Sequence, residues 1–397
     1  MTGTTPLKCA VLALALVWAL AWPLPALANF DSFIRGLWPQ AQSRGVPKAL
    51  FDAAFAGMTP EPEVLALTKK QPEFKSTSAQ YMVRRVSALR IEKGLAKAKE
   101  WGEVLGHIEA TYGVDRFIVL SVWGNETNFG GYLGGHNALR AMATLAYHGY
   151  RADYFRKELL HALDILAQGH TSPENMIGSW AGAMGHTQFM PSSFKAYAVD
   201  VTGDGRRDIW TTIPDALAST ANYLKVHGWR PGETWGYEVI LPPGAAGAKG
   251  QSHTIAEWKA RGVRRANGQD FPRPGDKARL LLPSGPSGPA LLVLPNFRVI
   301  KRYNNSDNYA LAVGHLADRL RGGGPFITPW PLDQVMPEKD RIEVQNRLNA
   351  LGYPAGDADG KFGPKTRDAI RAFQAATDTA VDGNYTPDVL DRLRAAK

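Results

Sequence analysis

Residues 114–131 read VDRFIVLSVWGNETNFGG, a stretch with the start and stop signals of a single helix. Asp115 precedes the apolar run, where an Asp side chain can accept hydrogen bonds from the first free backbone N–H groups of a helix. The glycine pair 130–131 follows the last apolar position and favours a helix end. We therefore predict a helix that begins after Asp115 and ends before residue 130.

Glu126 lies near the end of this predicted helix, on its apolar side. Val119, Val122 and Trp123 precede it by seven, four and three residues, so all four side chains share one face in 3.6-residue geometry. Burial and the negative end of the helix dipole both disfavour the ionised carboxylate, so we expect the pKa of Glu126 to be raised, as a general acid requires. Periodicity alone leaves open a solvent-facing glutamate at a frayed helix end.

The composition of the whole chain is that of a globular protein. Its 397 residues are 44% hydrophobic and 21% charged, enough for two or three domains. Its 46 Lys and Arg residues exceed its 37 Asp and Glu residues, and the formal net charge of +9 favours an anionic partner. The sequence holds no Walker motif and no HExxH motif, so nucleotide-dependent and zinc-protease chemistry have no support.

The first 28 residues have the layout of a secretory signal. MTGTTPLK carries one positive charge, CAVLALALVWALAW is apolar, and PLPALA ends in a small-x-small pattern. We expect cleavage after Ala28. The alternative is an uncleaved membrane anchor, but the apolar run is shorter than the roughly 20 residues that a spanning helix needs. Cleavage would remove Cys9, the only cysteine, and export makes intracellular nucleic acid a poor partner.

Beyond the signal, residues 29–321 show mostly helical periodicity, with one interruption. Between residues 236 and 300, the segments YEVILPP, ARLLLP and ALLVLPNFRVI are typical of short strands around turns, and predict a small β insertion. The stretch 322–332 opens with GGGPFITPWP, which indicates an interdomain linker.

Residues 333–397 form a second predicted domain with 10 basic and 11 acidic residues. DGKFGP at residue 359 recurs as DGNYTP at residue 382, and each copy precedes a helical stretch. With the opening EKDRIEVQNRLNALGY, this predicts three short helices joined by Asp-Gly turns. The pattern fits either a carbohydrate-polymer binding module or a structural helical cap.

A second motif, GSWAGAMGHTQFMPSSF, occupies residues 178–194. Its small residues let the backbone approach a ligand closely, while Ser179 and Gln188 supply hydrogen-bonding groups. Tight helix packing would also explain these small residues.

Taken together, the motifs resemble those of one known family. GNETNFGG, GSWAGAMGHTQFMPSSFKAYAVDVTGDG, ANYLKVHGW and IKRYNNSDNYALAV are similar, in order and spacing, to motifs of B-type lytic murein transglycosylases. IEVQNRLNALGY, DGKFGPKTRDAIRAFQ and DGNYTPDVL resemble the common peptidoglycan-binding domain. The resemblance implies a mainly α protein, with a lysozyme-like catalytic domain at residues 29–321 and a peptidoglycan-binding domain at residues 333–397. It also implies a periplasmic protein without a stable membrane anchor, and we expect a monomer.

The resemblance assigns the site residues. Glu126 matches the single catalytic acid/base of the family, and Trp180 stands where relatives often have Tyr. The residues that match substrate-binding positions are Ser179, Gln188, Asn304, Tyr154, Tyr223, Tyr303 and Tyr309.

The implied reaction cleaves the β-1,4 bond between N-acetylmuramic acid and N-acetylglucosamine. An ordinary glycosidase uses two carboxylates, whereas the motif offers one. One glutamate suffices if the substrate's acetamido group attacks first and the muramic acid 6-hydroxyl then closes a 1,6-anhydro ring. The alternatives are a hydrolytic muramidase of the same fold and a noncatalytic wall-binding protein.

Residues 200–208, DVTGDGRRD, resemble the start of an EF-hand calcium loop. Oxygen ligands would come from the side chains of Asp200, Thr202, Asp204 and Asp208 and from the carbonyl of Arg206. Thr211 replaces the usual twelfth-position glutamate, and Asp215 is the nearest substitute for it. We expect a weak structural site for Ca²⁺ or another cation, with a solvated turn as the alternative. The chemistry itself needs no cofactor.

Overall fold

The computed structural model describes residues 25–69, 76–331 and 335–396, apart from positions 380, 382, 384 and 386 and the side chains of 25–29 and 387. Most of the predicted signal segment lies outside this range, so its cleavage stays a prediction. Among the described residues, none of the helices combines the length and the apolar character that crossing a bilayer requires.

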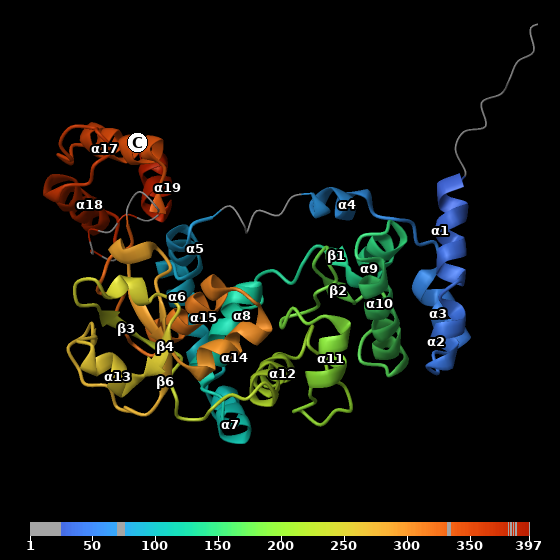
Figure 1. Cartoon of the computed structure of the whole chain (residues 1–397). Coiled ribbons are helices and arrows are strands. Elements are labelled where there is room, and N and C mark those ends of the chain that lie inside the picture. The colour runs from blue at the N-terminus through green and yellow to red at the C-terminus, as the bar shows by residue number, and fades with distance from the viewer. Residues whose placement is uncertain are drawn as a thin grey trace, which may run out of the picture.

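Most of the described chain before residue 321 is helical. Helices α8, α6, α7, α12 and α15 pack together, and α9 and α10 form a second group with α1, α2 and α3 (Figure 1). The helices are α1 (Pro25–Arg35), α2 (Trp38–Ser43), α3 (Lys48–Phe55), α4 (Pro62–Thr68), α5 (Ser78–Arg85), α6 (Ala88–Glu100), α7 (Gly102–Tyr112), α8 (Arg116–Thr127), α9 (Ala138–Tyr147), α10 (Ala152–Ala167), α11 (Pro191–Tyr197), α12 (Ile213–Val226), α14 (Pro295–Tyr303) and α15 (Asp307–Leu320).

Helix α8 has the predicted start, end and buried face. The Asp115 carboxylate accepts hydrogen bonds from the backbone N–H groups of Phe117 (2.9 Å) and Ile118 (3.2 Å). Asn128 ends the helix in the left-handed conformation, with φ of 52°. Val119 and the other apolar side chains of this face are buried in the main core.

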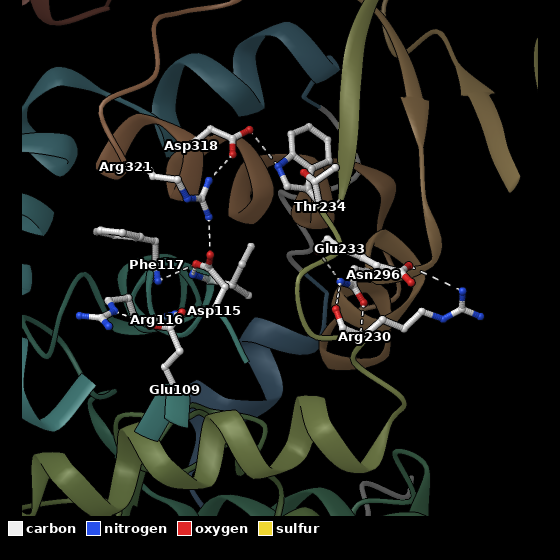
Figure 2. Close-up of polar contacts among 12 residues, drawn as sticks. Glu109, Asp115, Arg116, Phe117, Arg230, Glu233, Thr234, Asn296, Asp318 and Arg321 are labelled. Carbon is white, nitrogen blue, oxygen red and sulfur yellow. Dashed lines mark hydrogen bonds and ion pairs between the residues drawn. The ribbon is translucent and has the colours of Figure 1, made fainter. Parts of the chain in front are cut away.

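The N-terminal end of α8 is tied to the rest of the domain through Asp115 (Figure 2). Its second carboxylate oxygen lies 2.7 Å from Nη2 of Arg321, just beyond α15. Arg321 also pairs with Asp318, which accepts a hydrogen bond from the indole N–H of Trp235 at 2.9 Å. This chain of contacts connects α8 to α15 and to the start of the β insertion.

The β insertion is an antiparallel sheet with strand order β4-β6-β7-β3-β5. Its elements are β3 (Gly236–Ile240), η2 (Ala245–Ala248), β4 (Ser252–Thr254), α13 (Ile255–Ala260), β5 (Arg264–Arg265), β6 (Lys277–Leu281), η3 (Gly285–Ser287) and β7 (Ala290–Val293). In the register, Gly236 pairs with Val293 and Val239 with Ala290. Trp258 is buried in the insertion's own core.

One strand prediction was wrong in part. Only Ala290–Val293 of ALLVLPNFRVI forms a strand, whereas NFRVI belongs to α14. Pro295 occupies the first position of this helix, where the missing N–H of proline costs nothing and its fixed φ favours the helix.

The C-terminal segment folds as three short helices, as predicted: α17 (Glu338–Ala350), α18 (Pro364–Ala376) and α19 (Pro387–Ala395). Buried Gln345 holds the turn between the first two, because it donates to the Asp357 carbonyl (2.8 Å) and accepts from the Gly360 N–H (2.7 Å). Ala79 of α5 is buried in the same hydrophobic core as these helices. The C-terminal helices therefore lie against α5 (Figure 1).

The predicted linker contacts the preceding domain. Phe326 stacks on His315 of α15, with ring centroids 3.9 Å apart. The backbone N–H groups of Ile327 and Thr328 donate to the Glu238 carboxylate at 2.8 and 2.7 Å. Two further β elements, β1 (His136–Asn137) and β2 (Ile177–Gly178), pair antiparallel and bring the segment after α8 beside residues 178–189.

Candidate active site

Glu126 is half-buried in the last turn of α8, and Tyr309 is its hydrogen-bond partner across the site. The Tyr309 hydroxyl donates to Oε1 of Glu126 at 2.5 Å, although the two residues are 183 positions apart in the chain. Burial and the Glu126 carboxylate raise the pKa of Tyr309 well above its ordinary value. The hydroxyl therefore stays protonated and remains a donor to the carboxylate.

The predicted tyrosines 223, 303 and 309 come together beside Glu126. The rings of Tyr303 and Tyr309 stack with centroids 6.5 Å apart, and Tyr223 meets Tyr303 edge-on at 4.8 Å. The Tyr303 hydroxyl donates to the Thr187 carbonyl at 2.7 Å. Burial raises the pKa of Tyr223 to about 12 and holds the pKa of Tyr303 well above its ordinary value. All three phenols are therefore neutral near neutral pH, and the hydroxyl of Tyr309 is the one that contacts the glutamate.

The segment 178–189 forms a tight loop that carries two further predicted residues. Ser179 Oγ accepts from the N–H groups of Ala181 (3.3 Å) and Ala183 (3.1 Å). The Gln188 amide donates to the carbonyls of Leu133 (3.0 Å) and Gly185 (2.9 Å). Gln188 has a φ of +51°, an uncommon conformation for a residue with a side chain.

His186 joins this loop to α8 and is not among the predicted site residues. The indole N–H of Trp123 donates to Nδ1 of His186 at 3.0 Å. Burial lowers the pKa of His186 to about 4, so the ring is neutral and Nδ1 can accept. His186 lies two residues before Gln188 in GHTQ, which is the one feature of the sequence that suggests a role in the site. Its pairing with Trp123 could not be predicted from local patterns, because the two residues are 63 positions apart.

Two predicted residues have no recorded contact with the Glu126 cluster in the part of the chain that the structure describes. Tyr154 lies on α10, with its ring 4.1 Å from the Arg151 guanidinium carbon. Asn304 follows Tyr303 directly but is exposed, and its carbonyl accepts from the Ser306 N–H at 2.7 Å. Trp180 lies near Tyr150, at 6.5 Å between ring centroids.

The loop predicted to bind a cation is organised by its own carboxylates. Asp200 accepts from the N–H groups of Gly203 (2.6 Å) and Gly205 (2.8 Å), and Asp204 accepts from Arg206 (2.8 Å). Among the described residues, no group of three or more His, Cys, Asp or Glu side chains is arranged to hold a metal ion.

Two further carboxylates hold the backbone of this loop in place. Asp215 lies on α12, and Asp208 is the last residue of the loop. Buried Asp215 accepts from the N–H groups of Val201 and Asp208, both at 3.0 Å. Asp208 accepts from the N–H groups of Trp210 and Thr211, both at 2.9 Å. Burial, with a contribution from the Asp200 charge, raises the pKa of Asp215.

The fold and the site define a class of protein. The helical domain places one glutamate against a tyrosine hydroxyl, beside further aromatic side chains, and its fold is lysozyme-like. The family described as "Transglycosylase SLT domain" matches residues 29–318, and the "peptidoglycan binding domain" family matches residues 337–393.

Known relatives agree with the transglycosylase match. The membrane-bound lytic murein transglycosylase B of Escherichia coli (strain K12) is 34% identical over 246 residues, which are 60% of this chain and 66% of that relative. The structure of SltB3 from Pseudomonas aeruginosa in complex with NAG-NAM-pentapeptide is 46% identical and has a TM-score of 0.75, covering 92% of this chain and 99% of that one. Escherichia coli Slt35 in complex with calcium is 31% identical and has a TM-score of 0.63, covering 74% of this chain and 92% of that one.

The chain belongs to the transglycosylase SLT domain family, and it is a lytic transglycosylase of the type that these relatives represent. It is therefore an enzyme that acts on peptidoglycan, with a C-terminal peptidoglycan-binding domain.

Proposed function

We propose that this enzyme cleaves the β-1,4 bond between N-acetylmuramic acid and N-acetylglucosamine in peptidoglycan and leaves 1,6-anhydromuramic acid ends. The observation that carries the proposal is the hydrogen bond between Tyr309 and Glu126, within a cluster of neutral tyrosines. SltB3 supports it, because this relative has been solved with both NAG-NAM-pentapeptide and NAG-anhNAM-pentapeptide.

In the first step, protonated Glu126 donates its proton to the glycosidic oxygen as the bond to C1 breaks. The carbonyl oxygen of the substrate's own 2-acetamido group attacks C1 and forms a cyclic cationic intermediate. This attack replaces the second carboxylate of an ordinary glycosidase. Asp208 and Asp215, the buried carboxylates of the cation loop, are occupied by backbone N–H groups of their own region.

In the second step, the Glu126 carboxylate removes the proton from the muramic acid 6-hydroxyl. The oxygen O6 then bonds to C1, the acetamido oxygen leaves, and Glu126 is again protonated. No water is consumed. The Tyr309 hydroxyl stabilises the carboxylate between the two steps, because it remains a donor when Glu126 is ionised.

The remaining predicted residues position the sugars. The Gln188 and Ser179 side chains lie in the loop 178–189, which the Tyr303–Thr187 hydrogen bond attaches to the tyrosine cluster. Exposed Asn304 presents its amide to the acetamido group or the cationic intermediate, and Tyr154 extends the cleft wall from α10. We place the enzyme in the periplasm as a monomer, held on the wall by residues 333–397.

We further propose a structural Ca²⁺ at the loop 200–208, held by Asp200, Thr202, Asp204 and the Arg206 carbonyl, with Asp215 behind them. These ligands are hard oxygens, which suit Ca²⁺. The Asp200 charge acts on buried Asp215, and a cation would relieve this repulsion. Slt35 supports the assignment, because that relative is described in complex with calcium.

The cation proposal is tested by thermal unfolding with and without Ca²⁺. Wild type should melt at a higher temperature with Ca²⁺, because a ligand bound only to the folded state stabilises it, and Asp200→Ala combined with Asp204→Ala should not respond. A wild-type melting temperature that is unaffected by Ca²⁺ would show that this segment is only a turn.

The reaction is tested by the mass of the products from purified sacculi. Anhydro ends are lighter by one water than the reducing ends that hydrolysis leaves. Products with reducing ends would identify a hydrolytic muramidase, and the absence of soluble products would identify a wall-binding protein without catalysis.

A further inference from the structure

The loop that directly follows α8 carries an exposed aromatic residue. This loop reads GGYLGGH, residues 130–136, and leads from the end of α8 to β1 (Figure 1). Its Tyr132 is 68% exposed, whereas Tyr223 and Tyr309 of the active site are buried. The ring of Tyr132 therefore presents apolar surface to a ligand rather than to the protein core.

The backbone of Tyr132 is attached to the end of α8 that carries Glu126. The Tyr132 N–H donates to the Thr127 carbonyl at 3.1 Å, and Thr127 directly follows Glu126. The Gly130 N–H donates to Oγ1 of Thr127 at 3.2 Å. The base of the Tyr132 side chain thus has a fixed place relative to the glutamate.

The second half of this loop lies against the loop 178–189. The Leu133 carbonyl accepts a hydrogen bond from the Gln188 amide at 3.0 Å. Gly134 has a φ of +117° and lies so close to Gly178 that an added Cβ atom would be 1.9 Å from the Gly178 carbonyl oxygen. The two loops are therefore in direct contact, and Tyr132 lies between the end of α8 and a predicted substrate-binding residue.

The Tyr132 side chain extends along its own loop. Its hydroxyl oxygen lies beside Gly135, where an added Cβ atom would be 3.1 Å away. The faces of a pyranose ring carry C–H groups, which an aromatic ring can cover while the sugar hydroxyls stay in water. Because the loop is already fixed, holding a sugar on this ring costs little ordering of the backbone.

We propose that Tyr132 is a platform on which a pyranose ring of the glycan strand stacks, as a further sugar subsite beside the Glu126–Tyr309 pair. The inference rests on the proposed function. The occupant is the glycan rather than the peptide stem, because an uncharged ring offers no partner to the stem's carboxylates. Stacking here holds the strand in the cleft and leaves the chemical step to Glu126.

The first test reports binding at this position without any reaction. Tyr132→Trp in the Glu126→Gln background places an indole on the loop, and soluble glycan chains stripped of their stems are titrated in. We expect the tryptophan emission to shift to shorter wavelength, because a stacked sugar excludes water from the indole. Val226→Trp in the same background is the matched control, since Val226 is 61% exposed at the end of α12, and it should show no shift.

The second test measures KM and kcat on the same chains. Tyr132→Ala should raise KM about fivefold through the lost apolar contact, with kcat nearly unchanged, and Tyr132→Phe should behave like the wild type. Melting temperatures should stay at the wild-type value, because the side chain is exposed.

Three results would overturn the proposal: no emission shift with Tyr132→Trp, the same shift with free peptide stems, or an unchanged KM for Tyr132→Ala. Failure of the proposed function would look different. The wild type would then leave reducing ends or release no products, whereas the emission shift needs no reaction.

Discussion

The two ends of helix α8 each carry a carboxylate, and the two carboxylates have different surroundings. At the first end, Asp115 accepts two backbone hydrogen bonds and pairs with Arg321. At the last end, half-buried Glu126 faces a tyrosine hydroxyl and the carbonyl end of the helix. The helix dipole favours a negative charge at the N-terminal end and disfavours it at the C-terminal end.

The two carboxylates therefore have different roles: Asp115 is structural, and Glu126 is the proposed acid/base. The partners of Asp115 cap the start of α8 and hold this helix against α15. Glu126 accepts a hydrogen bond from the neutral hydroxyl of Tyr309, and in the proposed reaction it gives up and recovers a proton. A substitution at one end should therefore affect stability, and a substitution at the other end should affect turnover.

The largest expected effect is that of Glu126→Gln. The amide keeps the shape of the side chain but can neither donate nor recover the proton, so turnover on sacculi should fall by about a thousandfold or more. The melting temperature should stay close to that of the wild type. A folded variant that keeps a substantial fraction of turnover would exclude Glu126 as the acid/base.

Tyr309→Phe should have the next largest effect. It removes the hydroxyl that donates to Glu126 and leaves the ring stacked on Tyr303. We expect a loss of about ten- to a hundredfold in kcat/KM, the range of a hydrogen bond to a charged group. Stopped assays on soluble muropeptide chains measure it, and an unchanged kcat/KM would show that the contact does not assist the reaction.

His186 should make the protein sensitive to acid. Its pKa is about 4 in the native protein and about 6.5 when unfolded, so its contribution to stability is complete above pH 6.5 and is lost as pH falls toward 4. Denaturant unfolding of the wild type and of His186→Gln, whose amide can accept from Trp123, should differ in pH dependence over this window by roughly 2 kcal/mol. Parallel curves would contradict a neutral, buried His186.

Asp115→Ala should have the smallest effect on chemistry. Loss of the cap and of the pair with Arg321 should lower the free energy of unfolding by about 1 to 2 kcal/mol. Turnover of the folded protein at low temperature should change by less than about threefold. A large loss of turnover at unchanged stability would mean that Asp115 also contributes to the reaction, and that the two ends of α8 do not have separate roles.

Local rules predicted the helix around Glu126, because a cap, a 3.6-residue pattern and a glycine stop all lie within 18 residues. Local rules could not predict the contacts between residues that are far apart in the chain. Tyr309 was assigned by resemblance alone, and the pairing of Trp123 with His186 was not foreseen. The predicted strand at ALLVLPNFRVI was too long, because only its first four residues form β7. The apolar run continues past Pro295 into α14, and periodicity alone cannot distinguish a short strand from a helix.

The most direct test of the central claim is digestion of sacculi in water enriched in oxygen-18. If Glu126 acts alone and the 6-hydroxyl closes the ring, the muramic acid ends carry no heavy oxygen and are lighter by one water than reducing ends. Incorporation of one oxygen-18 atom at each new muramic acid end would contradict this account, because water would then be the nucleophile.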